Sequence, residues 1–226
     1  SCVIISEYPY FEGFNSSTIP NCWTIIDNEA NNQTWYPTTS VSSVTPYEGD
    51  YMMASKFHTS FQNDDWLISP QFKVTSNKLK VDFYAISTTS FSSYESFNVL
   101  VSKAGTAPTD FDIVLENIVD HPNTWQNHEY ILSEHGINVD DEIYIAIQHV
   151  SNNKWYLAVD AFRVSEIIST EAEITAYSIP EQVSSNINST EGTITVTMPY
   201  GTNVTELVAT FTLSDGASAK VGETDQ

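Results

Sequence analysis

Residues 79–85 read LKVDFYA, with an apolar side chain at every second position. Side chains of a β-strand point alternately to opposite faces, so this period predicts a strand with one buried face. The same alternation recurs in residues 97–101 (FNVLV) and 143–147 (IYIAI), and turn-rich stretches lie between these runs. No window combines a helical period with helix caps, so the sequence predicts an all-β fold.

The composition changes in residues 165–173 (SEIISTEAE), which are polar and acidic and predict a linker or the entry to a second unit. Beyond them, residues 192–199 (GTITVTMP) and 207–213 (LVATFTL) alternate again, which is typical of immunoglobulin-like strands. We therefore expect a β-sandwich over residues 1–167 and an immunoglobulin-like β domain over residues 168–226. Such domains usually run about 80 to 100 residues, so the last strands of the second one are expected to be missing.

The chain is strongly acidic. Its 29 acidic and 8 basic residues give a formal net charge of −21. Such a charge repels phosphate groups, and no basic patch is present to release counterions, which argues against nucleic acids and anionic membranes as partners. The charge has two interpretations: it serves solubility alone, or clustered carboxylates bind a hard divalent cation such as calcium. No run of about 18 apolar residues predicts a transmembrane helix.

The sequence lacks the motifs of common enzyme classes. It has no GxSxG, phosphate-binding loop or CxxC motif, and His128 is followed by Leu132 where a zinc protease needs its second histidine. The acid pairs Asp64-Asp65 and Asp140-Asp141 are adjacent, whereas glycoside hydrolysis needs two carboxyl groups about 5 to 10 Å apart across a cleft. We therefore predict no catalytic residue and no enzyme activity. A hydrolase with an unrecognised site is the remaining alternative.

The best metal candidate is the stretch 27–32 (DNEANN). Oxygen-bearing side chains fall at alternate positions, Asp27, Glu29 and Asn31, as at the first, third and fifth positions of calcium loops. Asn32 tolerates a left-handed turn. The match is partial, because glycine is absent at the sixth position and no bidentate glutamate closes the loop. The alternative is a polar surface loop that holds no ion.

Asp160 is unusual for its position in a predicted strand. It is in phase with Tyr156, Phe162 and Val164, so a carboxylate falls on an apolar strand face. A buried carboxylate without a partner is costly, and coordination to a cation would remove that cost. The alternatives are pairing with Arg163 or with backbone N–H groups at a sheet edge.

Five short signatures follow one another in a fixed order. They are residues 11–14 (FEGF), 20–27 (PNCWTIID), Trp35, 64–71 (DDWLISPQ) and 157–164 (LAVDAFRV). Over roughly residues 8–164 this order resembles the cleaved-adhesin family, the β-sandwich modules found in the haemagglutinin regions of gingipain proteases and in many bacterial surface proteins.

The resemblance implies a jelly-roll or MAM-like β-sandwich that acts as a non-catalytic adhesion module, secreted or at the bacterial cell surface, and binds a host protein or a glycan. In such modules a calcium ion ties the first strand to the last strand and to an early acidic loop. The matching positions are Glu12, Asp27 and Asp160. Together with Glu29 and Asn31, they are expected to form a structural calcium site.

One position departs from the family pattern: Ala161 stands where the family often has a second aspartate, which leaves the coordination number open. The stretch from Ile174 resembles small β domains that accompany surface adhesins and glycan-utilisation lipoproteins. The main alternative function is that of a carbohydrate-binding module from a polysaccharide-utilisation or glycoside-hydrolase system, because jelly rolls host both functions. Exposed aromatic rings on a concave face or rim would favour a glycan.

The aromatic residues divide into two groups. Three tryptophans lie in the signature stretches and are expected in the core or as a lid: Trp23, Trp35 and Trp66. Trp125 and Trp155 lie beside polar turns, where they contact a ligand or, alternatively, pack in the core. Phe91 and Tyr94 belong to a hydroxyl-rich loop, residues 88–96, which we predict to contact a partner because binding residues concentrate on loops.

Cys2 and Cys22 are the two cysteines of the chain. Two cysteines leave three interpretations open: a disulfide formed in an oxidising compartment, a lipid anchor through Cys2 at the bacterial surface, or two unrelated thiols.

Overall fold

The structure is a computed structural model, and it describes residues 2–60, 62–88, 94–167, 173–189, 191–214, 217–221 and 224–225. The chain forms two compact units, Ser1–Glu166 and Ile167–Gln226. The division falls one residue before the boundary expected from the change in composition. Among the described residues, no helix has the length and apolar character needed to cross a membrane.

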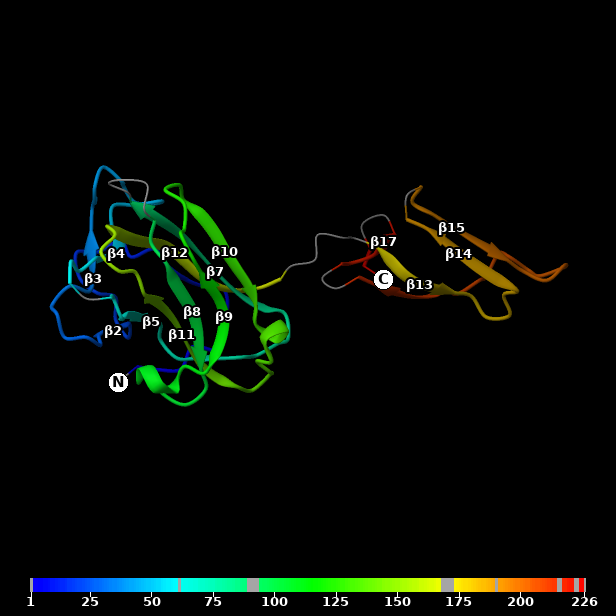
Figure 1. Cartoon of the computed structure of the whole chain (residues 1–226). Coiled ribbons are helices and arrows are strands. Elements are labelled where there is room, and N and C mark those ends of the chain that lie inside the picture. Colours follow the sequence, from blue (N-terminus) through cyan, green and yellow to red (C-terminus); the bar gives the residue numbers. More distant parts are fainter. Residues whose placement is uncertain are drawn as a thin grey trace. The chain divides into compact units, whose positions relative to one another are not determined.

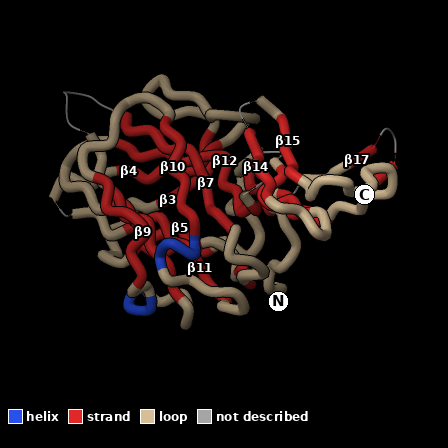
Figure 2. Tube along the Cα trace, turned by 90° about the vertical axis from the view of Figure 1, so that its right-hand side faces the viewer, coloured by secondary structure: helices blue, strands red, loops and turns tan. Residues whose placement is uncertain are grey.

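The first unit is a sandwich of two six-stranded sheets (Figure 1). All strand pairs within these sheets are antiparallel. The first sheet has the order β10 (Gln126–Ile131), β7 (Leu79–Thr88), β12 (Tyr156–Glu166), β4 (Met52–Lys56) and β3 (Trp35–Thr38), with β1 (Tyr10–Glu12) also beside β12. The second has the order β2 (Thr24–Asp27), β5 (Asp65–Ile68), β11 (Glu142–His149), β8 (Phe97–Ser102) and β9 (Ile113–Ile118), with β6 (Phe72–Lys73) also beside β11. Two short 3-10 turns, η1 (Pro108–Asp110) and η2 (Leu132–His135), complete the unit, and Figure 2 shows how little of the fold is helical.

The core between the sheets is built by the alternation seen in the sequence. On β7, β8 and β11 the predicted inward positions are all buried: Leu79, Val81, Phe83, Ala85, Phe97, Val99, Val101, Ile143, Ile145 and Ile147. The predicted all-β fold and its buried strand faces are therefore confirmed. The three signature tryptophans are buried as expected. Trp23 and Trp35 join this core, whereas Trp66 packs against Phe111 in a separate apolar cluster.

The outer face of the first sheet carries a second apolar layer. Val41, in the connection between β3 and β4, packs in one cluster with Met52, Ala54, Ile86 and Ala158. The last four residues stand on β4, β7 and β12, at outward positions of those strands. The β3–β4 connection therefore lies across this face of the sandwich.

A disulfide joins Cys2 to Cys22, with the two Cα atoms 5.7 Å apart and a sequence separation of 20. Of the three interpretations of the cysteines, the structure thus contains the disulfide. A lipid on the sulfur of Cys2 would require this bond to be absent.

The described residues of the second unit form three two-stranded antiparallel sheets. They pair β13 (Ile174–Ser178) with β16 (Thr210–Leu213), β14 (Ser184–Asn188) with β15 (Thr193–Thr197), and β17 (Lys220–Val221) with β18 (Thr224–Asp225). On β15, Ile194 and Val196 are half-buried and the threonines around them are exposed, as the alternation predicts. The predicted strand over residues 207–213 begins only at Thr210, and Val208 is 73% exposed, because no sheet partner covers this part of the segment among the described residues.

Candidate metal centre

The loop after β2 is shaped by its own first residue. Asp27 ends the strand, and its two carboxylate oxygens accept hydrogen bonds from the backbone N–H groups of Asn31 (3.1 Å) and Asn32 (2.7 Å). Ala30 and Asn32 adopt left-handed backbone conformations, with φ of 54° and 64°. The chain therefore folds tightly back around Asp27, and this turn sets the direction of the side chains that follow it.

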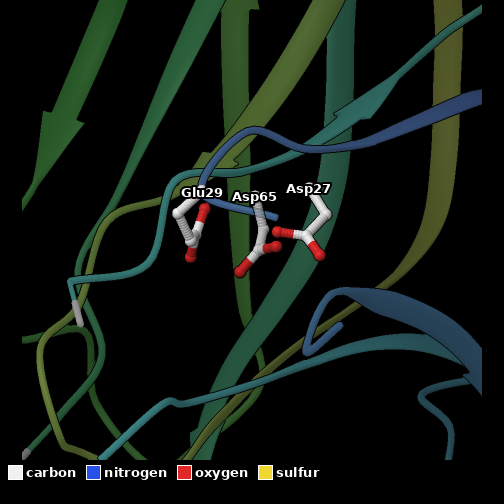
Figure 3. A group of neighbouring side chains, drawn as sticks. All are labelled: Asp27, Glu29 and Asp65. Carbon is white, nitrogen blue, oxygen red and sulfur yellow. The ribbon is translucent and has the colours of Figure 1, made fainter. Parts of the chain in front are cut away.

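Three carboxylates meet at this turn: Asp27, Glu29 and Asp65. One carboxylate oxygen of each lies within 4.8 Å of the others, and Figure 3 shows Asp65 between Glu29 and Asp27. The sheet brings Asp65 there, because Asp27 on β2 and Asp65 on β5 are register partners. Glu29 is held by the backbone N–H of Asp64, 2.9 Å from Oε2. Two neighbouring strands and one loop thus contribute an oxygen each.

Asp65 has an unsatisfied oxygen. Its side chain is fully buried, and Oδ2 accepts a hydrogen bond of 2.6 Å from Asn63 Nδ2. Oδ1 has no hydrogen-bond partner among the described residues, and neither has the buried hydroxyl of Thr34. Burial raises the pKa of Asp65 to about 7, and the charges of Glu29 and Asp27 raise it further, whereas Asn63 and the nearby hydroxyl of Thr34 act in the opposite direction. An ionised Asp65 is therefore compensated only in part, by Asn63 and Thr34, and hard oxygen atoms of this kind are what calcium prefers.

Asn31, also predicted as a ligand, supports the site through hydrogen bonds. Its Nδ2 donates to Glu29 Oε1 at 2.9 Å, and its Oδ1 accepts from the backbone N–H of Gln33 at 2.7 Å. The side chain of Asn31 thus fixes the position of Glu29, and its role as a metal ligand stays a prediction.

Glu12 and Asp160, the other predicted ligands, lie outside this group. Asp160 is fully buried, with Oδ1 accepting from the N–H of Ala161 (2.7 Å) and Oδ2 from the N–H of Glu48 (3.1 Å). Burial raises its pKa to about 6. Glu12 accepts from the N–H of Phe14 at 2.7 Å, and burial raises its pKa as well. Of the alternatives weighed for Asp160, backbone N–H groups are its hydrogen-bond donors. A calcium clamp through Glu12 and Asp160 stays a prediction.

In the sequence, Asp65 stands out only as half of the acid pair Asp64-Asp65, and this hides its place beside Asp27 and Glu29. Asp64 points the other way, and its Oδ1 accepts hydrogen bonds from Trp66 Nε1 (2.6 Å) and Gln148 Nε2 (2.7 Å). One signal was available. Asp65 is in phase with the buried Leu67, so the alternation of the strand already turns its carboxylate inward.

A second group of ionisable side chains lies in the core. His149 Nδ1 is 2.8 Å from Ser55 Oγ, and His149 Nε2 is 2.9 Å from Glu95 Oε2. Burial alone would raise the pKa of Glu95, but its hydrogen bond to His149 and the charge of that ring outweigh burial and lower it. The order serine–histidine–acid is that of a hydrolase triad. All three side chains are fully buried, however, so Ser55 is closed to a substrate in this structure.

The predicted ligand-binding aromatics have different environments. Phe91 lies outside the described residues, and Tyr94 is half-buried. Trp125 is half-buried at the edge of the outer apolar layer. Trp155 is half-buried, and its ring stacks on Phe57 with centroids 4.9 Å apart. Both tryptophans therefore pack on the sandwich and still keep part of their surface in solvent.

Comparison with known proteins agrees with this fold. Residues 7–173 match the family model of the cleaved adhesin domain, and residues 174–224 match a model described as "SGBP, N-terminal". Haemagglutinin A of Porphyromonas gingivalis strain W83 is 30% identical over 115 residues, which are 48% of this chain and 5% of that protein. The chain thus spans a small fraction of this relative.

Two solved adhesin domains of Lys-gingipain share the fold. The K1 domain from Porphyromonas gingivalis W83 is 20% identical, with a TM-score of 0.60 over 72% of this chain and 100% of that domain. The K2 domain is 22% identical, with a TM-score of 0.57 over 70% of this chain and 99% of that domain. The family model covers most of the chain, and the strands that hold the carboxylate group all lie within it. The chain therefore belongs to the cleaved adhesin domain family.

Proposed function

We propose that this chain is a non-catalytic adhesion module, located outside the cell or at a bacterial surface, that binds a host extracellular protein or a glycan and holds a structural calcium ion. Its membership of the cleaved adhesin family supports the adhesive role. The name of its relative, haemagglutinin A, supports the same class of function, although the shared region is a small part of that protein.

The calcium proposal rests on one observation: the fully buried Asp65 carries an oxygen without a hydrogen-bond partner, beside two further carboxylates. The residues present fit a hard divalent cation, because all three side chains offer oxygen. Asp27, Glu29 and Asp65 would hold the ion. When bound, calcium neutralises the carboxylates and cross-links β2, its following loop and β5. The role is structural, and no step of a reaction is assigned to it.

Thermal unfolding with EDTA and then with excess calcium tests the ion. A site that exists only in the folded state should raise stability by about 2.7 kcal/mol when calcium is a hundred times its Kd. We expect Asp65→Asn to abolish this rise. Asp160→Asn, at an equally buried carboxylate of the same sandwich, should retain it. If Asp160→Asn loses the rise and Asp65→Asn keeps it, the ion lies between the first and last strands instead. If wild type shows no rise and elemental analysis finds no calcium, the metal proposal is wrong.

Binding to a printed panel of extracellular matrix proteins and glycans tests the adhesive role. We expect the calcium-loaded chain to bind at least one class of target, and binding to weaken when EDTA loosens the sandwich. A folded, calcium-loaded chain that binds neither class would contradict the proposal.

A further inference from the structure

The outer face of the first sheet has two parts: charged side chains, Lys80, Asp82, Glu129 and Arg163, occupy one part, and apolar side chains occupy the other. Residues 36–47 (YPTTSVSSVTPY), the end of β3 and most of its connection to β4, contain no charged residue and are rich in hydroxyl groups. Glu48 and Asp50 lie in the rest of the connection. Below it, the strands present small apolar side chains, Ala54, Ile86 and Ala158. The apolar part of this face, beneath residues 36–47, is the part that could accept an uncharged ligand.

A tight hairpin fixes the middle of this connection. Val41 and Val44 exchange backbone hydrogen bonds of 3.0 and 2.8 Å, and between them Ser42 and Ser43 have φ of 46° and 70°. These are the angles of a type I′ turn, in which asparagine and glycine are the favoured residues. Serine in a left-handed conformation is strained, and such strain gathers at functional positions. The valines pack on the sheet, and the two serines stand exposed at the tip of the hairpin.

An aromatic group lies on one side of the hairpin. The rings of Tyr47 and Tyr84 are stacked, with centroids 3.6 Å apart and planes at 13°, and Trp125 meets Tyr47 edge-on at 6.0 Å. Tyr47 remains 44% exposed although Tyr84 covers one of its faces, so the exposed part of the ring is turned away from Tyr84. The next residue anchors this platform, because the N–H of Glu48 donates to the buried Asp160.

A second aromatic group lies near the tip of the hairpin. Trp155 stacks on Phe57 and meets Tyr156 edge-on, with ring centroids 5.5 Å apart in the latter pair. Its indole N–H donates to the hydroxyl of Ser42, and its backbone N–H donates to the carboxylate of Glu95. The half-exposed indole is therefore held in one orientation beside a serine hydroxyl.

The two groups are spaced along the sheet. Tyr84 on β7 is paired with Asp160 on β12, and Tyr156 lies four residues earlier on β12. Four residues of a strand span about 13 Å. The aromatic groups therefore flank the hairpin at a distance that a ligand of several rings can bridge.

From this arrangement we infer that the face binds a neutral oligosaccharide, with sugar rings stacked on Tyr47 and Trp155 and sugar hydroxyls bonded by Ser42 and Ser43. The C–H face of a sugar ring is apolar and gains from burial against an aromatic ring, and its hydroxyls need neutral donors and acceptors. This inference rests on the proposed adhesive function and names the class of its ligand.

The charges around the face favour a neutral ligand over an ionic one. Lys154 is already paired with Asp120 at 2.6 Å. The carboxylate of Glu48 is directed toward Gly13, where an added Cβ would lie 3.0 Å from its Oε1. Lys56, the register partner of Tyr156, stands at one border of the apolar part. Lys80 and Arg163 stand beyond the other border, beside Asp82 and Glu129. An acidic polysaccharide would meet Lys56, two cations that already neighbour carboxylates, and the repulsion of the whole chain.

Affinity electrophoresis tests the inference, since a chain of this charge migrates readily in a native gel. The gels contain galactan, xylan, glucomannan or dextran as neutral probes, and polygalacturonate or hyaluronate as acidic ones. We expect at least one neutral polysaccharide to retard the wild type. Tyr47→Ala and Trp155→Ala should each weaken binding about tenfold or more. Tyr200→Ala, at the fully exposed tyrosine of the second unit, is the matched control and should bind as the wild type does.

Tyr47→Phe and Trp155→Phe separate stacking from folding, because they keep the ring and should keep most of the affinity. Retardation by acidic polysaccharides alone, or equal retardation of wild type and both alanine variants, would overturn the inference. Binding to the protein panel without binding to any polysaccharide overturns the inference and leaves the adhesive function standing. If the chain binds neither the protein panel nor any polysaccharide, both the inference and the proposed adhesive function are wrong.

Discussion

At the scale of single residues, two buried carboxylates of one sandwich are satisfied in different ways. Asp160 receives backbone N–H groups on both of its oxygens. Asp65 receives one side-chain N–H on Oδ2, and its Oδ1 has no partner among the described residues. Both have a raised pKa because of burial. A bound cation would therefore stabilise the ionised form of Asp65 more than that of Asp160.

Asp65→Asn should therefore change stability in opposite directions with and without calcium. In EDTA at pH 8 the variant should be more stable than the wild type, because a buried charge beside Asp27 and Glu29 is removed. A pKa raised from 3.8 to about 7 sets an upper limit of about 4 kcal/mol on this gain. In saturating calcium the wild type should become the more stable of the two.

Urea unfolding of both proteins under both conditions measures this reversal. Asp64→Asn removes the neighbouring carboxylate and is the control. It shows whether the loss of any negative charge at the start of β5 produces the same reversal of stability. A variant less stable than the wild type in EDTA would show that ionised Asp65 is already compensated by the protein.

At the scale of elements, side chains on one side of the sandwich connect an edge strand of one sheet to an edge strand of the other. Glu116 on β9 accepts a hydrogen bond of 2.6 Å from the hydroxyl of Tyr130 on β10. That hydroxyl lies 3.3 Å from His128 Nδ1, and His128 Nε2 lies 3.0 Å from His121 Nε2. This chain of contacts connects β9, β10 and the loop between them.

The contacts between β9, β10 and their loop should stabilise the fold less as the pH falls. Burial lowers the pKa of His121 from 6.5 to about 4, and the neighbouring His128 lowers it further, whereas Glu116 acts in the opposite direction. The unfolded chain then binds more protons than the folded one between pH 6.5 and 4, so this contribution to stability is complete above pH 6.5 and is lost as the pH falls. The difference of about 2.5 pKa units corresponds to about 3 kcal/mol.

His121→Asn removes this titration and keeps a donor for the carbonyl of Pro122. We expect the difference in unfolding free energy between wild type and variant to shift by about 3 kcal/mol from pH 7 to pH 4, to the disadvantage of the wild type. Comparing the two proteins at each pH cancels the opposite trend of the buried carboxylates. His58→Asn is the control, and an equal shift there would rule out a specific role of His121.

The sequence predicted the strands better than the contacts between them. Alternation in residues 79–85 identified a buried strand because the period of two is a local property of the chain. The pair of His121 and His128 forms because a loop turns back onto β10, and the group at Asp65 forms because β5 pairs with β2. Both depend on how distant segments align. A spacing in the sequence carries no record of that alignment, so the acidic loop was recognised and its partner on β5 was not.

At the scale of the whole molecule, the first unit contains its own core. The main hydrophobic cluster draws its buried residues from Phe14 to Val164, and the proposed calcium site lies within the same unit. Its fold therefore depends on contacts made inside residues 1–166.

A protein of residues 1–167 should consequently fold alone, with the unfolding midpoint and the calcium response that this unit has in the full chain. Differential scanning calorimetry of both proteins measures the two quantities. A lower midpoint or a lost calcium response in the shorter protein would show that the second unit stabilises the first.

The disulfide also determines how the first unit carries mechanical tension. The start of β1 lies beside the end of β12, with Tyr10 opposite Val164, so a pull on the ends of an unlinked chain would peel this pair apart one hydrogen bond at a time. The Cys2–Cys22 bond carries force past β1 and delivers it just before β2, in the opposite sheet. Tension then acts between two packed sheets, which must separate together. Under the proposed adhesive function, oxidation of these cysteines would raise the force at which the domain opens under load.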